Sequence, residues 1–203
     1  MPRDRTKTRT RIVKAAYVLF HRKGFDRIGV DEIAAEASVS KRTLYNHFRS
    51  KDELLAECLE SQNGLALAGF KSWSDRLAGT CDPMIREMFT ELSRWSAKPR
   101  WSGSGYTRVA MELADLPGHP ARVMARRHKT MLEGYLTELL AKADVESPRE
   151  KARTLWILSE GAMVMTLITG DRSYIATAER AARMLVRSRS GKMHRSKPHS
   201  DSK

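Results

Sequence analysis

The stretch VSKRTLYNHF, residues 39–48, decides how the N-terminal part of this chain folds. Leu44 and Phe48 are four residues apart, so a helix buries both on one face. Ser40 is an expected N-cap, because its hydroxyl can accept a hydrogen bond from a free backbone N–H of the first turn. The side chains that then point outward are those of Arg42, Tyr45, Asn46 and Arg49, with Thr43 and His47 on the flank. The stretch predicts a short amphipathic helix whose exposed face is rich in hydrogen-bonding groups.

Two helices are expected before this stretch. Residues 8–23 carry apolar side chains at helical spacing, and Gly24 after them is typical of a left-handed residue that ends a helix. A second, short helix should span residues 30–37, and a tight turn at Ser38 should join it to the third. Two short helices joined by a tight turn and braced by a preceding helix form the helix-turn-helix plan, in which the second of the pair lies in the major groove of DNA.

A fourth helix is expected to begin after Ser50. Ser50 and Glu53 have the spacing of a capping box, in which each side chain satisfies a free backbone N–H of the helix start. Lys51 lies in the first turn, where a cation opposes the helix dipole at a cost of roughly 0.3–1 kcal/mol. A phosphate bound at this helix start would reverse that cost. Lys51 is therefore a candidate phosphate contact, and an ordinary surface lysine is the alternative.

Positive charge is concentrated at the two ends of the chain. The 203 residues carry a formal net charge of +13. Residues 1–50 contribute +7 and residues 186–203 contribute +5, which leaves the long middle nearly neutral. Because Lys and Arg neutralise phosphates in nucleic-acid complexes, the basic N-terminal part is the first candidate for a DNA-binding site. A merely solvated basic surface is the alternative.

The residue types on the exposed face of the third helix suit DNA. Arginine can pair bidentately with guanine and asparagine with adenine, whereas Tyr, Thr and His commonly hold phosphates. A helical enzyme or carrier is one alternative class, but no Asp, Glu, His, Ser or Cys residues cluster at catalytic spacing. Cys58 and Cys81 lack metal-ligand spacing, so no metal and no cofactor is expected. A sequence-indifferent architectural protein is the other alternative, although it would not need a large second part.

Residues 8–60 resemble the DNA-binding domain of the TetR/AcrR family of transcriptional regulators. The resemblance rests on residues 39–48 together with Lys51 and the Leu54-Leu55 pair. It implies a regulator that is usually a homodimeric repressor, binds a palindromic operator and is released by a small ligand. By matching positions, it implies contacts to the DNA backbone from Thr43, Tyr45, His47 and Lys51, and contacts to bases from Lys41, Arg42 and Asn46. Activation in place of repression remains open.

Two positions depart from the family's pattern. The family usually has Thr or Ser where Gly29 precedes the second helix, and Gly where Ser38 makes the turn. Gly29 is a tolerable N-cap, whereas a left-handed backbone at Ser38 costs roughly 1–2 kcal/mol. These departures affect local stability more than function.

A larger helical body is predicted for residues 61–186. It resembles the family's regulatory domains more loosely, through segments such as Leu158-Ser159-Glu160-Gly161-Ala162. Residues 149–168 are apolar on nearly every face, so this helix should be buried on all sides, partly against a second subunit. Members of the family dimerise through their last long helices, so residues 120–141 and 149–168 are candidates for an intermolecular four-helix bundle. The candidate interface residues are Leu155, Leu158, Ala162 and Met165.

Met and aromatic side chains in this body could line an apolar ligand pocket, because thioethers and indoles adapt to varied ligands. The candidates are Trp73, Met88, Phe89, Trp95, Met111, Met124, Met131, Trp156 and Met163. Ordinary core packing is the alternative for all of them. Glu160 lies in an apolar helix, where it should pair with an Arg across the dimer or stay protonated, and contact with a ligand is the alternative. His119 and His128 are expected on the surface or in loops.

The predicted protein is all-α and has three parts. Residues 1–60 form a three-helix helix-turn-helix domain that binds double-stranded DNA, and residues 61–186 form a ligand-binding and dimerisation domain. Residues 187–203 are a basic tail with almost no large apolar side chains, where disorder is expected. No signal peptide and no membrane span are evident, so a cytoplasmic homodimer with an unknown small-molecule effector is expected.

Overall fold

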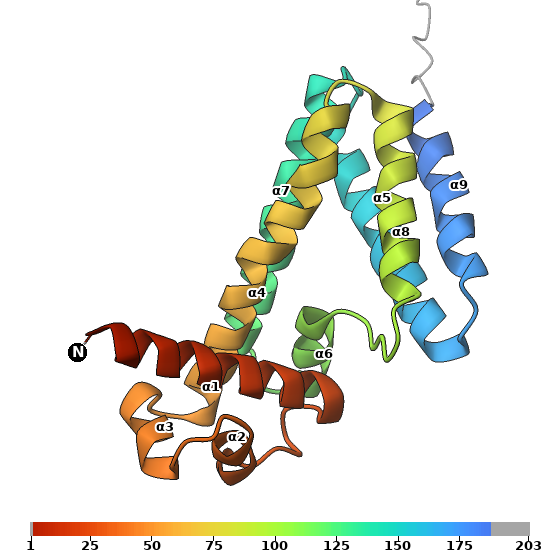
Figure 1. The fold of residues 1–203 in the computed structure, drawn as a ribbon. Helices are drawn as coiled ribbons and strands as arrows, with labels where there is room; N and C mark the ends of the chain where they lie inside the picture. Colours follow the sequence, from red (N-terminus) through yellow and green to blue (C-terminus); the bar gives the residue numbers. More distant parts are fainter. Residues whose placement is uncertain (1, 188–203) are drawn as a thin grey trace, which may run out of the picture.

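A computed structural model describes residues 2–187 of the chain, and these residues are helical with no strand (Figure 1). The helices are α1 (Pro2–Lys23), α2 (Val30–Glu36), α3 (Lys41–His47), α4 (Lys51–Ser74), the short 3-10 helix η1 (Asp75–Leu77), α5 (Cys81–Ser96), α6 (Gly105–Glu112), α7 (Pro120–Lys142), α8 (Pro148–Thr169) and α9 (Ser173–Arg187). The all-α prediction is confirmed. The expected tail lies, from residue 188 onward, outside the described residues.

Helix α1 ends where its sequence predicts but begins earlier. Gly24 has a left-handed backbone with φ 89°, and its N–H donates to the carbonyl of Phe20 at 2.9 Å. Phe25 then folds back so that its ring lies 5.4 Å from that of Phe20. The helix begins at Pro2 and not at Thr8, and the guanidinium of Arg9, ahead of the first buried apolar residue Ile12, bonds to the end of α3.

The turn and the third helix form as expected. Ser38 adopts the left-handed backbone with φ 50°, and its N–H donates to Ala35. The hydroxyl of Ser40 accepts a hydrogen bond from the N–H of Thr43 at 3.0 Å, which is the predicted N-cap of α3. Leu44 and Phe48 are buried in one core with residues of α1, α2 and α4. The polar face of α3 is therefore held in one orientation by its apolar face.

Helix α4 joins the two parts of the chain without a break. The Ser50 hydroxyl accepts the N–H of Glu53 at 3.1 Å, as a capping box requires, but the Glu53 carboxylate accepts the N–H of Arg49 at 2.7 Å in place of that of Ser50. The helix then continues through residue 60 to Ser74. The expected boundary between residues 60 and 61 thus falls inside a continuous helix. Helix α4 therefore belongs both to the N-terminal part and to the body.

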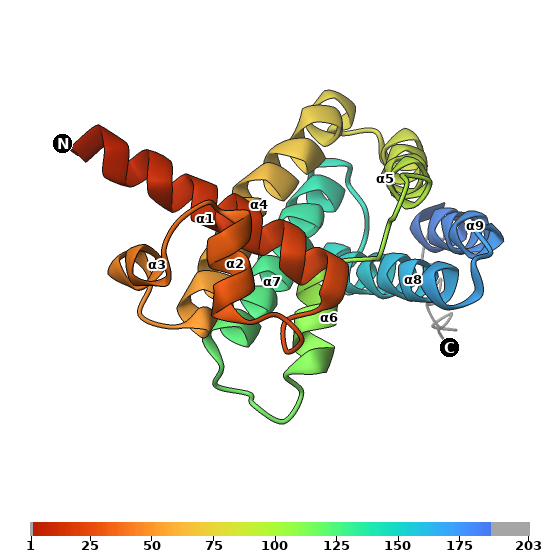
Figure 2. The same cartoon turned by 60° about the horizontal axis from the view of Figure 1, so that its bottom comes forward.

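The body is a set of long helices above α1, α2 and α3 in the view of Figure 1. Helices α4 and α7 lie side by side, α5, α8 and α9 form the other side, and α6 lies between α1 and the body (Figures 1 and 2). Its core is apolar and closely packed. Its fully buried members with relative exposure of 1% or less are Met84, Ile85, Phe89, Leu136, Leu139, Leu140, Ala152, Leu155 and Ala182.

His128 lies in the interior, so the expectation of a surface or loop position is wrong for it. Its side chain is only 5% exposed and its Nδ1 lies 2.6 Å from the Oδ1 of Asn63. The imidazole stacks on the ring of Tyr106 at a centroid distance of 3.7 Å. Tyr106 in turn donates to the carbonyl of Leu59 at 2.8 Å. These contacts bind α4, α6 and α7 together through a buried polar pair, which must stay hydrogen-bonded to be tolerated.

Glu160 is paired within its own chain, which corrects the expectation of an Arg partner from a second subunit. Its carboxylate accepts hydrogen bonds from the ammonium of Lys129 and, at 2.9 Å, from the hydroxyl of Thr107. Burial lowers the pKa of Lys129, while the nearby Glu160 carboxylate acts in the opposite direction. Glu160 therefore connects α8 to α7 and to α6.

The buried imidazole should make stability depend on pH. Burial, with Lys129 nearby, lowers the pKa of His128 to about 4. The unfolded chain therefore binds one more proton than the folded chain between pH 6.5 and 4, and the free energy of unfolding falls as the pH falls through this window. The loss is at most roughly 3 kcal/mol, from 1.36 kcal/mol per pKa unit. Denaturant unfolding at several pH values measures it. His128→Gln, which cannot titrate, should flatten the curve, and equal slopes in the two proteins would contradict the assignment.

Candidate nucleic-acid interface

The exposed side of α3 carries the residues expected to contact DNA. Lys41, Arg42, Tyr45 and Asn46 are exposed, while Thr43 and His47 are half-buried. A recognition helix needs such a face because base edges are read by side chains that project into the groove. The backbone of α3 is fixed at both ends, by the Ser40 cap and by Phe48, which is 1% exposed. The structure thus presents six of the seven predicted DNA contacts on one short helix.

Two side chains of this face already form hydrogen bonds to other residues of the chain. The ammonium of Lys41 lies 3.0 Å from the carboxylate of Asp31 on α2, and this hydrogen bond raises the pKa of Lys41. The hydroxyl of Thr43 shares a hydrogen bond of 2.8 Å with that of Ser40. The side chains of Arg42 and Asn46, by contrast, form no hydrogen bond within residues 2–187, so they can offer all their donors and acceptors to bases.

Lys51 has a different environment from the one expected of a free phosphate contact. Its ammonium donates to the carbonyls of Phe25 at 3.0 Å and of Ile28 at 3.2 Å, and lies 4.1 Å from the centre of the Phe25 ring. Two of its three N–H groups are therefore used to fix the loop between α1 and α2 to the start of α4. Its first role is to hold the domain together, and a single donor is left for a phosphate.

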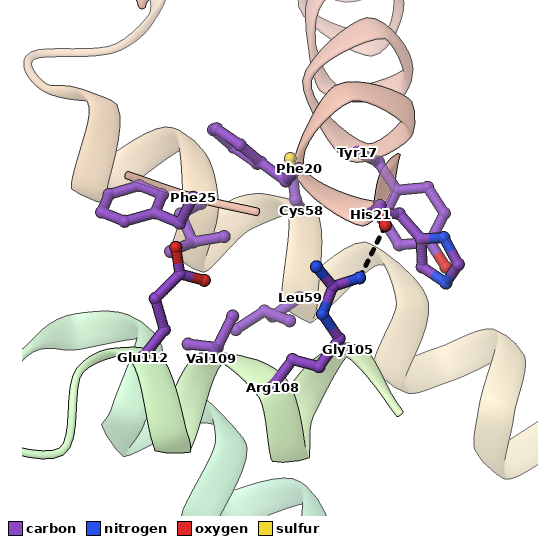
Figure 3. A pocket seen from close by; sticks show the side chains of 11 residues that line it. Tyr17, Phe20, His21, Phe25, Cys58, Leu59, Gly105, Arg108, Val109 and Glu112 are labelled. Atoms are coloured by element: carbon purple, nitrogen blue, oxygen red, sulfur yellow. Dashed lines mark hydrogen bonds between the residues drawn. The ribbon is translucent and has the colours of Figure 1, made fainter. Parts of the chain in front are cut away.

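Helix α6 makes a second connection between the DNA-binding part and the body. Arg108 donates to the carbonyl of His21, at the end of α1, at 2.7 Å (Figure 3). Glu112 accepts the N–H of Asp26, in the loop after α1, at 2.8 Å. Burial, together with the charge of Arg108, lowers the pKa of His21. Sequence patterns could not predict these bonds, because they join residues more than 80 positions apart.

A third connection runs from the start of α7. The imidazole of His119 accepts the N–H of Ala121 and so caps α7, and its Nε2 lies 3.4 Å from Asp52 in the first turn of α4. Its ring meets that of Phe25 edge-on at 5.9 Å. His119 follows a loop, as expected, but its side chain is buried there. The loop after α1 is therefore held from α4, α6 and α7 at once.

A small cavity lies at this junction between α1, α4 and α6 (Figure 3). Its volume is about 30 Å³, which is room for about one water molecule. The side chains around it are mainly apolar, with Arg108 and Glu112 at its edge: Tyr17, Phe20, His21, Phe25, Leu55, Cys58, Leu59 and Val109. None of the nine candidate pocket residues lines it.

The nine candidate pocket residues do not share one lining. Trp73, Met88 and Phe89 are buried in the core of the body, with Trp156 packed against it. Met163 is also buried, and Trp95, Met124 and Met131 are half-buried. Met124 packs against the other core, that of the DNA-binding part. Met111 is 62% exposed, so it faces solvent and not an interior pocket.

The candidate interface residues of α8 also separate into two groups. Leu155 and Ala162 are buried within one chain, Leu158 is half-buried and Met165 is 36% exposed. The apolar side chains that α8 leaves most exposed are Ile157 and Ile168, at 64% and 70%. On α9, Met184 is 73% exposed. The open apolar surface of these two helices therefore lies on a different side of α8 from Leu155.

Residues 2–187 lack two other kinds of site. They contain no group of three His, Cys, Asp or Glu side chains placed to hold a metal ion. No helix in the same part of the chain has both the length and the apolar character that a membrane crossing needs.

Comparison with known proteins agrees with this geometry. The sequence model described as "Bacterial regulatory proteins, tetR family" matches residues 12–58. The HTH-type transcriptional repressor SCO4008 of Streptomyces coelicolor is 29% identical over 154 residues, which cover 70% of this chain and 74% of that protein. The HTH-type regulator YerO of Bacillus subtilis and the transposon Tn10 TetC protein of Escherichia coli are each 39% identical, over stretches covering 24% and 26% of their own lengths.

Solved structures extend the likeness to almost the whole chain. SCO4454, a TetR-family transcriptional regulator from Streptomyces coelicolor, has a TM-score of 0.76 and 25% identity, and the match covers 90% of this chain and 95% of that one. Escherichia coli NemR in its reduced form has a TM-score of 0.82 over 91% of this chain and 99% of that one, at 18% identity, and so shares the fold.

The helix-turn-helix and the exposed face of α3 therefore define a DNA-binding regulator of transcription, a class of protein that is not an enzyme. The family match and the likeness over nearly the full chain assign it more narrowly. Residues 12–58 match the TetR family of transcriptional regulators, and nearly the whole chain is similar in structure to a regulator of that family.

Replacing Arg42 tests the base-reading role of α3. Arg42→Ala should weaken binding to the preferred duplex by about 1–3 kcal/mol and reduce the preference for it over a scrambled duplex, because a bidentate pair with a base is lost. Arg42→Lys should restore charge but not preference, because an ammonium lacks the planar fork of a guanidinium. Fluorescence anisotropy with both duplexes measures this, and an unchanged preference in Arg42→Ala would refute the assignment.

Proposed function

We propose that this protein is a repressor that binds a palindromic operator as a homodimer and is released by a small apolar or amphipathic ligand. A repressor from Streptomyces coelicolor matches most of its length, which supports the direction of regulation. As a regulator that binds genomic DNA, it would act in the cytoplasm. The seven predicted DNA contacts, Lys41, Arg42, Thr43, Tyr45, Asn46, His47 and Lys51, belong to this proposal, with Lys51 acting mainly through the loop that it holds.

The observation that carries the homodimer is the open apolar face of α8 and α9. Helix α8 already packs on α7 and α9 within one chain, yet Ile157 and Ile168 remain mostly exposed. Tyr174 and Met184 on α9 are exposed as well. Large apolar side chains left exposed on two neighbouring helices are the kind of surface that an interface would cover. A second copy related by a two-fold axis would bury the same face of both chains.

The pair of helices at this interface differs from the pair that the sequence suggested. The outer side of α7 carries the exposed arginines Arg126 and Arg127, and charged residues are depleted in interface cores. We therefore assign the four-helix contact to α8 and α9 of the two subunits, in place of α7 and α8. Such a dimer would present its two α3 helices to successive major grooves. The spacing between the two helices would be about 34–36 Å or slightly more.

A charge on the open face should prevent assembly. Ile157→Asp is expected to produce a folded monomer with at least tenfold weaker operator binding, because two carboxylates would be buried in the interface without partners. Analytical ultracentrifugation measures the mass and circular dichroism the fold. Val123→Asp, at a 39% exposed position on α7, is the matched control and should stay dimeric. A monomeric unmutated protein, or a dimeric Ile157→Asp protein, would contradict the proposed interface.

The proposed ligand response depends on a cluster formed by Glu160, Lys129, Thr107 and Trp156, which we call the Glu160 cluster. Glu160 and Lys129 are about three-quarters buried, and the Lys129 ammonium lies 5.5 Å from the centre of the Trp156 ring. Convergent polar groups beside an aromatic side chain are typical of ligand sites. A ligand would act only by binding one state of the body better than another, so its effect on DNA binding is limited to its differential affinity for the two states.

Helix α6 connects this cluster to α1, and so to the helices that are proposed to bind DNA. Thr107 bonds to Glu160 on one side of α6, and Arg108, the next residue, bonds to the end of α1. A ligand that takes the place of Thr107 at Glu160 would shift α6 and with it the DNA-binding part. A coupling of about 1–3 kcal/mol would lower operator affinity by 5- to 150-fold.

Thr107→Val should mimic the ligand. It removes the hydroxyl that bonds to Glu160 but keeps the shape of the side chain, so DNA affinity of the free protein should fall toward that of the ligand-released state, by up to about 5- to 150-fold. Compounds that release the unmutated protein in a screen of apolar and amphipathic molecules should then lose most of their effect. Thr154→Val is the control, because Thr154 is a half-buried threonine of α8 whose hydroxyl bonds to the carbonyl of Glu150 in the same helix. If no compound lowers operator affinity, the ligand-release part of the proposal is wrong.

A further inference from the structure

The first turns of α1 lie outside the part of the chain that matches the family. The match begins at residue 12, whereas α1 begins at Pro2. Residues 2–11 contain five basic residues and one acidic residue. In both views these turns extend past α3 (Figures 1 and 2). We call residues 2–11 the basic arm.

Arg9 fixes the direction of the basic arm relative to the recognition helix. Its Nη1 donates to the carbonyl of His47 at 2.8 Å, and its guanidinium lies 4.2 Å from the centre of the Phe48 ring. Its Nη2 also lies 3.1 Å from the carboxylate of Glu57 on α4. The arm is thus fastened to the C-terminal end of α3 through backbone, ring and ion-pair contacts together.

Arg5 lies one turn before Arg9, on the same side of α1. Its Nη2 donates to the carbonyl of Asn46 at 3.5 Å, which is a long bond and uses one of the five N–H groups of the guanidinium. Its side chain is exposed. A cation near the start of a helix also opposes the helix dipole. The fold therefore gains little from Arg5, and its remaining donors face outward beside the C-terminal end of α3.

The dimensions of DNA place a phosphate near this guanidinium. A helix with its side chains is about 10–12 Å wide, and the major groove is about 12 Å wide, so a recognition helix fills the groove and phosphates line its flanks. The C-terminal end of such a helix commonly lies against the backbone. A group bonded to a carbonyl at this end of α3 is therefore at the wall of the groove.

We infer that Arg5 of the basic arm binds a phosphate of the strand that borders α3, as a DNA contact additional to the helix-turn-helix. The inference rests on the proposed docking of α3 in the major groove. A planar guanidinium suits a phosphate because it can donate two parallel hydrogen bonds. His47, whose carbonyl holds Arg9, lies beside the same flank, so the two residues would border one segment of backbone.

The test uses the full-length protein and a 30-base-pair duplex that it selects from a random pool. Arg5→Ala should reduce the slope of log affinity against log salt by about 0.9 for each bound subunit. The same slope predicts affinity about 8-fold weaker per subunit at 0.1 M salt and only about 2-fold weaker at 0.5 M. The preference for the selected duplex over a scrambled one should be unchanged. Ethylation interference should show that Arg5→Ala loses dependence on one or two phosphates in each half-site.

Lys7→Ala is the matched control, because Lys7 has the same charge on the same helix but lies about 200° further round it. It should change the salt slope much less than Arg5→Ala. Equal losses in the two variants would mean diffuse attraction and would overturn the specific contact, as would an unchanged slope in Arg5→Ala. A changed duplex preference in Arg5→Ala would show base reading and overturn the phosphate assignment. If the unmutated protein selected no duplex at all, the proposed function itself would fail, and this outcome is separate from the others.

Discussion

Burial of Leu44 and Phe48 in one core with α1, α2 and α4 is the contact on which the rest of the molecule depends. These two side chains set the rotation of α3 about its axis, and that rotation decides which polar side chains reach DNA. Arg9 of α1 covers the Phe48 ring from outside, so the basic arm follows the same orientation. Since a large buried side chain contributes roughly 1.5–3 kcal/mol, these contacts far outweigh the surface ion pairs around them.

The loop after α1 is the point at which DNA binding and the body meet. Lys51 of α4, Glu112 of α6 and His119 of α7 all contact this loop or the ring of Phe25 within it. The cavity between α1, α4 and α6 has a volume of only about 30 Å³, so the side chains that line it pack against one another. Closely packed contacts transmit displacement, because their partners cannot yield without leaving gaps. A shift of α6 or α7 would therefore reach α2 and α3 without passing along the whole of α4.

The body combines an apolar core with two buried polar pairs. His128 with Asn63 and Glu160 with Lys129 join α4, α6, α7 and α8, where apolar contacts alone would allow several packings. Removal of one partner leaves a desolvated polar group and costs about 1–3 kcal/mol or more, so each pair favours a single arrangement of its helices. A proton can compete for His128, and in the proposed mechanism a ligand competes for Glu160.

Local sequence patterns determined the helices and the reading face of this protein. The Ser40 and Ser50 caps, the left-handed Gly24 and Ser38, and the spacing of Leu44 and Phe48 each depend on residues within one or two turns, so the sequence alone predicted them. The family resemblance rests on that same stretch.

Tertiary structure decided which partners meet across long separations. Lys51 bonds to Phe25, Glu160 bonds to Lys129, and Arg9 bonds to His47, and no spacing rule connects such pairs. It also decided which side of α8 remains open. That helix is apolar all round, so its sequence could not distinguish Leu155, which is buried in its own chain, from Ile157, which is exposed. Helical periodicity records the faces of one helix, whereas burial depends on the other helices that the fold brings against each face.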